Sequence, residues 1–173
     1  MNLETNPIAE PDAIRLAELL EQANVRIVFA ESCTCGMVAG LLGQVPGISN
    51  WLCGSAVCYR VPTKQRWLNV PPETVAEHTP ESIATSESMA EGALTNTPEA
   101  SLSVAVTGHL GPDAPDDLDG IIHLAGCVRD SQDLHSVTMK IDGHHRIQRQ
   151  HNASLEVLKF ASQLIKLTWP SRS

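Results

Sequence analysis

A short apolar run that is followed at once by hydroxyl, thiol and glycine residues constrains this chain more than any other feature. Residues 25–30 are mostly apolar and β-branched and predict a buried strand, whereas residues 36–42 are small and apolar and predict a helix. A strand that turns directly into a helix points backbone N–H groups and the positive end of the helix dipole outwards. The turn at residues 32–35 therefore suits a nucleophile or an anion. The plain alternative is that Ser32 or Thr34 only caps the helix.

Helix-like and strand-like segments alternate along the rest of the chain. We expect helices over residues 11–24, 34–44, 80–94 (with Thr79 as N-cap) and 144–167, with short ones from residue 62 and at 73–77. We expect strands over residues 25–30, 54–59, 101–107, 121–129 and 134–141, of which the last two form a hairpin joined by residues 130–133. This order predicts an α/β fold, a three-layer α/β/α sandwich with a mixed, mostly parallel sheet. Residues 1–10 are expected to be a disordered lead-in and residues 11–173 a single domain.

The composition of the chain disfavours some binding partners and cellular locations. The net charge is -8, from 12 basic and 20 acidic residues, which disfavours nucleic-acid binding. Residues 1–10 are polar and no apolar run reaches membrane-spanning length, so we expect neither a signal peptide nor a membrane partner. The odd number of cysteines, five, favours reduced thiols over a disulfide framework, and hence a cytoplasmic protein.

Polar residues follow three of the predicted strands. Ser32 follows the first, Tyr59 with nearby Lys64 follows the second, and Thr107-Gly108 ends the third. Ligands of open α/β sheets bind outside the carboxyl ends of the strands, so these residues are expected to face one cleft. Ser32 would be a nucleophile if Lys64, with a lowered pKa, took its proton, and Tyr59 would relay that proton or hold Lys64. The plain alternative is a solvated helix lysine and an ordinary strand end.

Two further readings come from the cysteines and the acidic loop. Cys33 lies near the start of a predicted helix, where the pKa of a thiol falls, so a Cys33 nucleophile is conceivable. Cys33 and Cys35 with His109 or His123 do not match a recognised zinc spacing, and the aspartates of residues 113–119 lack the pattern of a calcium loop. We therefore expect neither a metal nor another cofactor.

Several motifs, in order and at matching spacing, make the chain similar to the CinA C-terminal domain family. The segment 30–36, Ala-Glu-Ser-Cys-Thr-Cys-Gly, resembles the family motif A-E-S-C-T-G-G. The resemblance continues through segments 45–49 (V-P-G-S-S in the family), 59–64 (Y-S-N-E-A-K), 69–78 (G-V-P-x-E-T-L-x-x-H-G), 89–93 and 104–112, the last like V-T-G-I-A-G-P. It spans residues 11–168.

The resemblance implies a three-layer α/β sandwich, usually oligomeric, and hydrolysis of the carboxamide of nicotinamide mononucleotide to the acid and ammonia. It implies Ser32 as nucleophile, Lys64 as general base and Tyr59 as their assistant, with a small-molecule nucleotide as substrate and without a metal. It places the substrate site at Glu31, Cys33, Thr34, Cys35, Gly36, Thr107 and Gly108. Full-length relatives carry a second domain, so we expect this protein to stand alone or to act in trans.

The chain departs from the family pattern around the implied substrate. Cys35 replaces a glycine, Val61 replaces an asparagine, and the glycine-rich loop becomes residues 108–115 with fewer glycines and more negative charge. The family G-D-R near the last helix becomes Gly-His-His at 143–145. The sequence therefore leaves open a second hypothesis, a catalytically silent protein that binds a ligand or partner.

Overall fold

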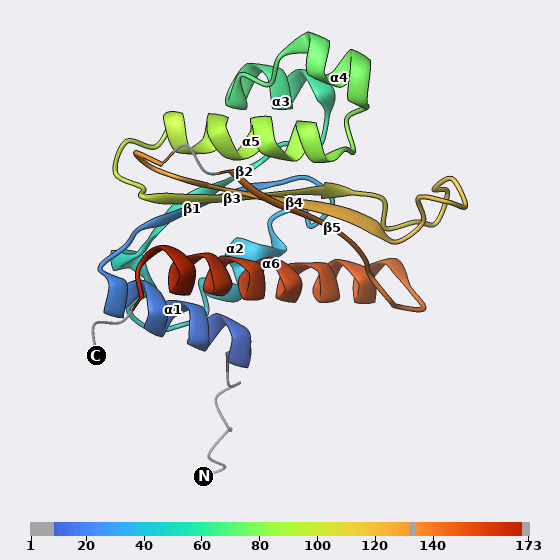
Figure 1. The fold of residues 1–173 in the computed structure, drawn as a ribbon. Helices are drawn as coiled ribbons and strands as arrows, with labels where there is room; N and C mark the ends of the chain where they lie inside the picture. Colours follow the sequence, from blue (N-terminus) through green and yellow to red (C-terminus); the bar gives the residue numbers. More distant parts are fainter. Residues whose placement is uncertain (1–8, 132–133, 171–173) are drawn as a thin grey trace.

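The computed structural model describes residues 9–131 and 134–170, and these form a five-stranded mixed sheet in the order β2-β1-β3-β4-β5 (Figure 1). Strands β1 to β3 are parallel, whereas β4 is antiparallel to both of its neighbours. The strands are β1 Ile27–Glu31, β2 Leu52–Val57, β3 Leu102–Gly108, β4 Ile121–Val128 and β5 Leu134–Lys140. The helices are α1 Pro11–Ala23, α2 Met37–Leu42, α3 Val61–Leu68, α4 Pro72–His78, α5 Ile83–Thr95 and α6 Arg146–Thr168, with a 3-10 turn at Ile48–Asn50. The predicted α/β/α sandwich is confirmed.

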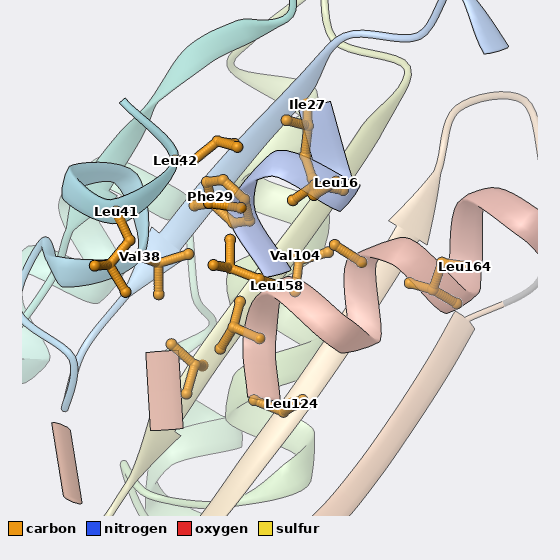
Figure 2. Packing of buried hydrophobic residues seen from close by; sticks show 14 of the residues in the cluster. Leu16, Ile27, Phe29, Val38, Leu41, Leu42, Val104, Leu124, Leu158 and Leu164 are labelled. Carbon is orange, nitrogen blue, oxygen red and sulfur yellow. The ribbon is translucent and has the colours of Figure 1, made fainter. Parts of the chain in front are cut away.

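One face of the sheet holds the larger core. Helices α1, α2 and α6 cover this face, and the side chains of Phe29, Val104 and Leu124 point into it from three neighbouring strands (Figure 2). Leu16 from α1 and Leu158 from α6 complete the packing. All five residues of β1 are buried, as expected for a strand that lies between β2 and β3 and is covered on both faces of the sheet.

The opposite face is covered by α5, with α3 and α4 lying beyond it (Figure 1). Small strand residues such as Ala30, Ala105 and Ala125 let α5 approach the sheet closely. Helix α3 lies equally close to α5, since a Cβ atom at Gly92 would overlap the carbonyl oxygen of Leu68. A glycine at position 92 therefore sets the position of α3.

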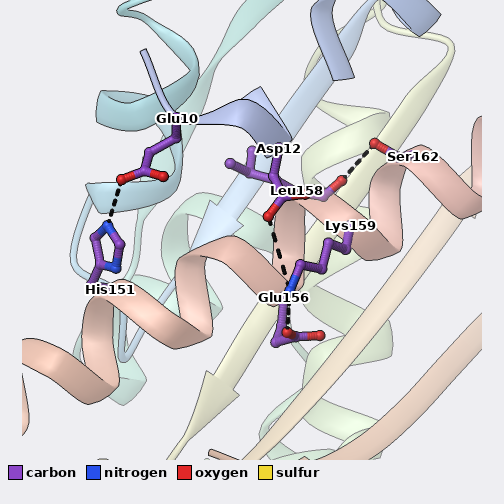
Figure 3. A network of polar contacts seen from close by, with 7 residues as sticks. All are labelled: Glu10, Asp12, His151, Glu156, Leu158, Lys159 and Ser162. Atoms are coloured by element: carbon purple, nitrogen blue, oxygen red, sulfur yellow. Dashed lines mark hydrogen bonds and ion pairs between the residues drawn. The ribbon is translucent and has the colours of Figure 1, made fainter. Parts of the chain in front are cut away.

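Polar contacts at the surface join the first helix, α1, to the last one, α6. The side chains of Glu10 and His151 lie 3.1 Å apart, and Lys159 of α6 lies 2.8 Å from Glu156 and 3.9 Å from Asp12 of α1 (Figure 3). Ion pairs exposed to water contribute little to stability, so the apolar packing below them holds the two helices together.

Two predicted helix starts are wrong. Helix α2 begins at Met37 and not at residue 34, because Cys35 (φ 54°) and Gly36 (φ 92°) are left-handed and break the helical path. Helix α5 begins at Ile83 and is capped by Ser82, whose hydroxyl accepts a hydrogen bond from the N–H of Thr85. Thr79 (φ 71°) accepts bonds through its carbonyl instead.

Most of the predicted lead-in, residues 1–8, and the centre of the hairpin connection, residues 132–133, lie outside the described residues. Among the helices of the described part, none combines the length and the apolar character that crossing a bilayer requires.

Candidate active site

The first three strands deliver polar residues to the same edge of the sheet. Because β1, β2 and β3 are parallel, Ser32, Tyr59 and His109 follow their carboxyl ends side by side. Strand β5 also ends at this edge, so the start of α6, with Arg146, arrives there as well. This is the place where open α/β sheets bind ligands.

A buried lysine and a serine form the floor of the site. The Lys64 amino group donates a hydrogen bond to Ser32 Oγ at 2.9 Å and one to Thr107 Oγ1 at 3.2 Å. The Thr107 hydroxyl donates in turn to the carbonyl oxygen of Pro80 at 3.2 Å. Residues from β1, α3, β3 and the segment before α5 are thereby joined in one chain of hydrogen bonds.

The surroundings of Lys64 favour its neutral form. Its side chain is 0% exposed, and this burial lowers the pKa of the amino group below its usual range. The negative charge of Glu81 acts in the opposite direction and raises that pKa, but burial is the larger effect. A lysine of this kind is suited to act as a general base towards Ser32.

Glu31 organises the turn that carries Ser32. Its carboxylate is 0% exposed and accepts three backbone bonds, from the N–H groups of Gly36, Val38 and Ala39 at 2.9, 3.1 and 3.1 Å. It also accepts hydroxyl bonds from Thr34 at 2.8 Å and from Ser55 on β2 at 2.9 Å. The carboxylate therefore satisfies the otherwise unpaired N–H groups at the start of α2 and compensates the helix dipole.

A pocket of about 260 Å³ opens above Ser32. Its wall includes the ionisable side chains of Glu81, His109, Asp113 and Arg146. The remaining lining residues are Ser32, Cys33, Tyr59, Gly108, Leu110, Gly111, Pro112 and Ala114.

Arg146 forms hydrogen bonds with residues on two sides of the pocket, Gly111 in the loop after β3 and Tyr59 after β2. Its guanidinium group donates one hydrogen bond to the carbonyl oxygen of Gly111 and another, of 2.9 Å, to the hydroxyl oxygen of Tyr59. Tyr59 is 50% exposed. The hydroxyl of Tyr59 thus lies on the pocket wall with Arg146, whereas the amino group of Lys64 bonds Ser32 and Thr107.

The residues predicted to bind substrate fall into three groups. Cys33 and Gly108 line the pocket. Thr34 and Gly36 each donate a hydrogen bond to the Glu31 carboxylate, and Thr107 accepts one from Lys64. Cys35 is exposed.

The expected lowering of the Cys33 thiol pKa is wrong. Cys33 is buried, and desolvation raises the pKa of its thiol to about 12 despite the nearby Lys64 and Arg146 charges. Within residues 9–131 and 134–170, no three His, Cys, Asp or Glu side chains gather in a way that could hold a metal ion.

Sequence analysis placed the loop of residues 108–115 near the substrate but did not name residues 109–115, Arg146 or Glu81 as part of the site. Leu110 to Ala114 belong to a loop whose position after a parallel strand was a usable signal. Arg146 was the first cation after the altered Gly-His-His segment. No pattern pointed to Glu81. The predicted helix of residues 80–94 included Glu81, whereas α5 begins at Ile83 and leaves Glu81 in the segment before it.

The fold and the site together define a class: an α/β domain with a serine and a buried lysine at the carboxyl edge of a mixed sheet. A structure of a competence/damage inducible protein from Agrobacterium tumefaciens superposes with a TM-score of 0.83 at 27% identity, over 92% of this chain and 99% of that one. A competence damage-inducible protein structure from Klebsiella pneumoniae gives a TM-score of 0.84 at 25% identity, over 91% of this chain and 96% of that one.

The family model for the CinA C-terminal domain matches residues 10–165, and the chain belongs to this family. A CinA-like protein from Myxococcus xanthus is 38% identical over 119 residues, which are 68% of this chain and 28% of that protein. A second CinA-like protein, from Syntrophotalea carbinolica, is 29% identical over 160 residues, 91% of this chain and 35% of that protein. The chain thus spans about a quarter to a third of the length of these curated relatives.

Proposed function

We propose that this protein hydrolyses the carboxamide of nicotinamide mononucleotide, or of a related amide, to the acid and ammonia. The observation that carries the proposal is the fully buried Lys64 amino group, 2.9 Å from Ser32 Oγ at the floor of a pocket. A serine becomes a nucleophile only when a base takes its proton, and burial makes Lys64 such a base. We also propose that the protein acts in the cytoplasm, as the odd number of cysteines favours, and as a homo-oligomer, as its resemblance to the family implies.

The hydrogen bonds around Lys64 support proton transfer from Ser32 once Lys64 is neutral. The Thr107 hydroxyl donates a hydrogen bond to the Pro80 carbonyl oxygen, so its own oxygen accepts a hydrogen bond from Lys64. A neutral Lys64 that donates to Thr107 can turn its lone pair towards the Ser32 hydroxyl. Thr107 is therefore a positioning residue of the proposed mechanism.

The reaction then proceeds in two halves. Ser32 Oγ attacks the amide carbon while its proton passes to Lys64 Nζ, and this proton is returned to the nitrogen that leaves as ammonia. Water next attacks the resulting ester, Lys64 takes a proton from it, and the acid departs as Ser32 regains its proton. In each half of the reaction Lys64 thus takes up one proton and then releases it.

The oxyanion of the tetrahedral intermediate needs donors beside Ser32. The N–H groups of Gly36, Val38 and Ala39 bond Glu31, so we assign this role to the N–H groups of Cys33 and Thr34, which follow the nucleophile directly. Glu31 contributes by holding the turn, and Tyr59, fixed by Arg146, orients the amide from the pocket wall.

The altered pocket rim favours one second candidate, a silent protein that binds a ligand without turning it over. His109, Leu110 and Asp113 line the pocket in the loop where the family pattern is rich in glycine. This candidate keeps the pocket but requires no chemistry from Ser32 and Lys64.

Ammonia release tests the proposal. Wild type and Ser32→Ala are incubated with nicotinamide mononucleotide and related pyridine amides, and both are checked for folding by circular dichroism. Turnover in the wild type that falls by about 10³-fold or more in Ser32→Ala is expected, as for other serine nucleophiles. Ser101→Ala, outside the pocket, is the matched control. Full activity in folded Ser32→Ala would refute the mechanism, and binding without turnover would support the silent candidate.

A further inference from the structure

The charges on the pocket wall bear on which amide the site accepts. The lining holds two carboxylates, Glu81 and Asp113, and one guanidinium group, Arg146. Arg146 already donates to Gly111 and Tyr59, and Lys64 is not among the residues that line the pocket. One positive charge thus faces two negative ones.

The rest of the rim increases this imbalance. Asp116 and Asp117 follow Asp113 in the same exposed loop, and the whole chain carries a net charge of -8. Arg149, the next cation on α6, is paired with Asp119 at 2.6 Å. An anionic group entering the pocket therefore meets a net negative field, whereas a cation is attracted.

We propose that the pocket selects cationic pyridinium carboxamides and discriminates against a substrate that carries a phosphate. The inference rests on the proposed function and specifies its substrate class. Glu81 is the residue that receives the positive ring, and Asp113 is the residue that opposes a phosphate at the rim. The preferred substrate is then the pyridinium ribonucleoside and not its 5′-monophosphate.

The size and depth of the pocket fit this assignment. A volume of about 260 Å³ lies just below the range of about 300–1,000 Å³ usual for ligand pockets, which suits a single ring with a ribose. The ring nitrogen of a pyridine-3-carboxamide is separated by one ring carbon from the carbon that bears the amide. A substrate whose amide lies at Ser32 thus carries its positive charge into the same small space as Glu81.

Binding of such a cation also assists the base. The charge of Glu81 raises the pKa of Lys64, and a positive ring beside Glu81 offsets this influence. The substrate therefore shifts Lys64 towards its neutral form when it binds. A neutral amide of the same shape lacks this effect.

The test compares kcat/KM for ammonia release from nicotinamide riboside and from nicotinamide mononucleotide. The ratio of nucleoside to nucleotide is expected to exceed one in the wild type and to fall about threefold or more in Asp113→Asn, since one nearby charge is removed. Asp117→Asn removes the same charge from the same loop outside the pocket lining and is expected to change the ratio less. A wild-type ratio of one or below overturns the proposal, and so do equal effects of the two variants.

Calorimetric binding to Ser32→Ala separates this inference from the proposed chemistry. If neither compound releases ammonia, the amidase proposal fails, and the charge preference is then decided by binding alone. Tighter binding of the nucleoside, weakened relative to the nucleotide by Asp113→Asn, supports the selection. Equal or tighter binding of the nucleotide refutes it.

Discussion

The floor and the rim of the pocket differ in almost every physical property. The floor consists of Glu31, Ser32, Lys64 and Thr107, which are buried and bonded to one another or to backbone, and of these four Ser32 lines the pocket. The rim, residues 108–115, is a loop in which Pro112 and Asp113 are exposed and ionisable groups line the opening. The floor matches the family pattern, whereas the rim departs from it.

This difference indicates that the parts of the site for chemistry and for recognition are constrained separately. A buried lysine is tolerated only where its neighbours accept its hydrogen bonds, so any change at the floor disturbs several residues at once. A loop residue at the rim has few such obligations and can change with little cost in stability. The three variants below test whether floor and rim are as separate as the structure indicates.

Lys64→Met is expected to have the largest effect and to move activity and stability in opposite directions. It removes the proposed base, so amidase activity should fall by about 10³-fold or more. The folded protein should gain about 1 kcal/mol, because an apolar side chain replaces a buried group that ionises in the unfolded chain. Since the pKa of Lys64 is lower when folded, wild-type stability rises with pH between that lowered value and the ordinary lysine pKa, and the variant loses this rise.

Urea unfolding at neutral and at alkaline pH measures this stability change. The exposed Lys166→Met is the control and should alter neither quantity. A destabilised Lys64→Met would show that the bonds to Ser32 and Thr107 outweigh the cost of burial.

Glu31→Gln is expected to destabilise the fold by about 2–4 kcal/mol, since it replaces one carboxylate oxygen by an NH₂ group that faces donors. The N–H groups of the turn would then lose part of their bonding. Chemical unfolding measures the change, with the exposed Glu21→Gln as control. If Glu31→Gln unfolds like the control, the carboxylate does not hold the turn.

Glu81→Gln tests the coupling between rim and floor and should have the smallest effect. Removing the negative charge takes away an influence that raises the pKa of Lys64, so the acidic limb of the kcat/KM profile should move to lower pH. The pH profile of the exposed Glu73→Gln provides the comparison. A limb that stays in place would mean that the rim does not affect the base.

The arrangement of the strands was predictable because hydrophobic periodicity determines it. The five strands, their alternation with helices and the closing hairpin follow from sequence patterns, although β2 is Leu52–Val57 and not residues 54–59 as predicted. The starts of α2 and α5 were not predictable in this way. Before α2, the turn is held by hydrogen bonds from its backbone N–H groups to the Glu31 side chain, which no local propensity reports.

The site, like the fold, was predictable only in part. Ser32 and Lys64 emerged from strand ends and from the resemblance, and the structure brings them within a hydrogen bond. Their catalytic roles remain a prediction. The positions of Glu81 and Arg146 depend on where separate loops and helix starts meet, and that is decided by packing of the whole domain.

The close contact between Gly92 of α5 and Leu68 of α3 has a consequence for how the sequence of this protein can change during evolution. Lys64 reaches Ser32 from α3, a helix of eight residues whose position is set where Leu68 lies against Gly92. The alignment of base and nucleophile is thus adjusted from a point on the far side of α5, without any change in the pocket. Substitutions along this seam are therefore expected to change the proposed activity while every residue that lines the pocket is kept.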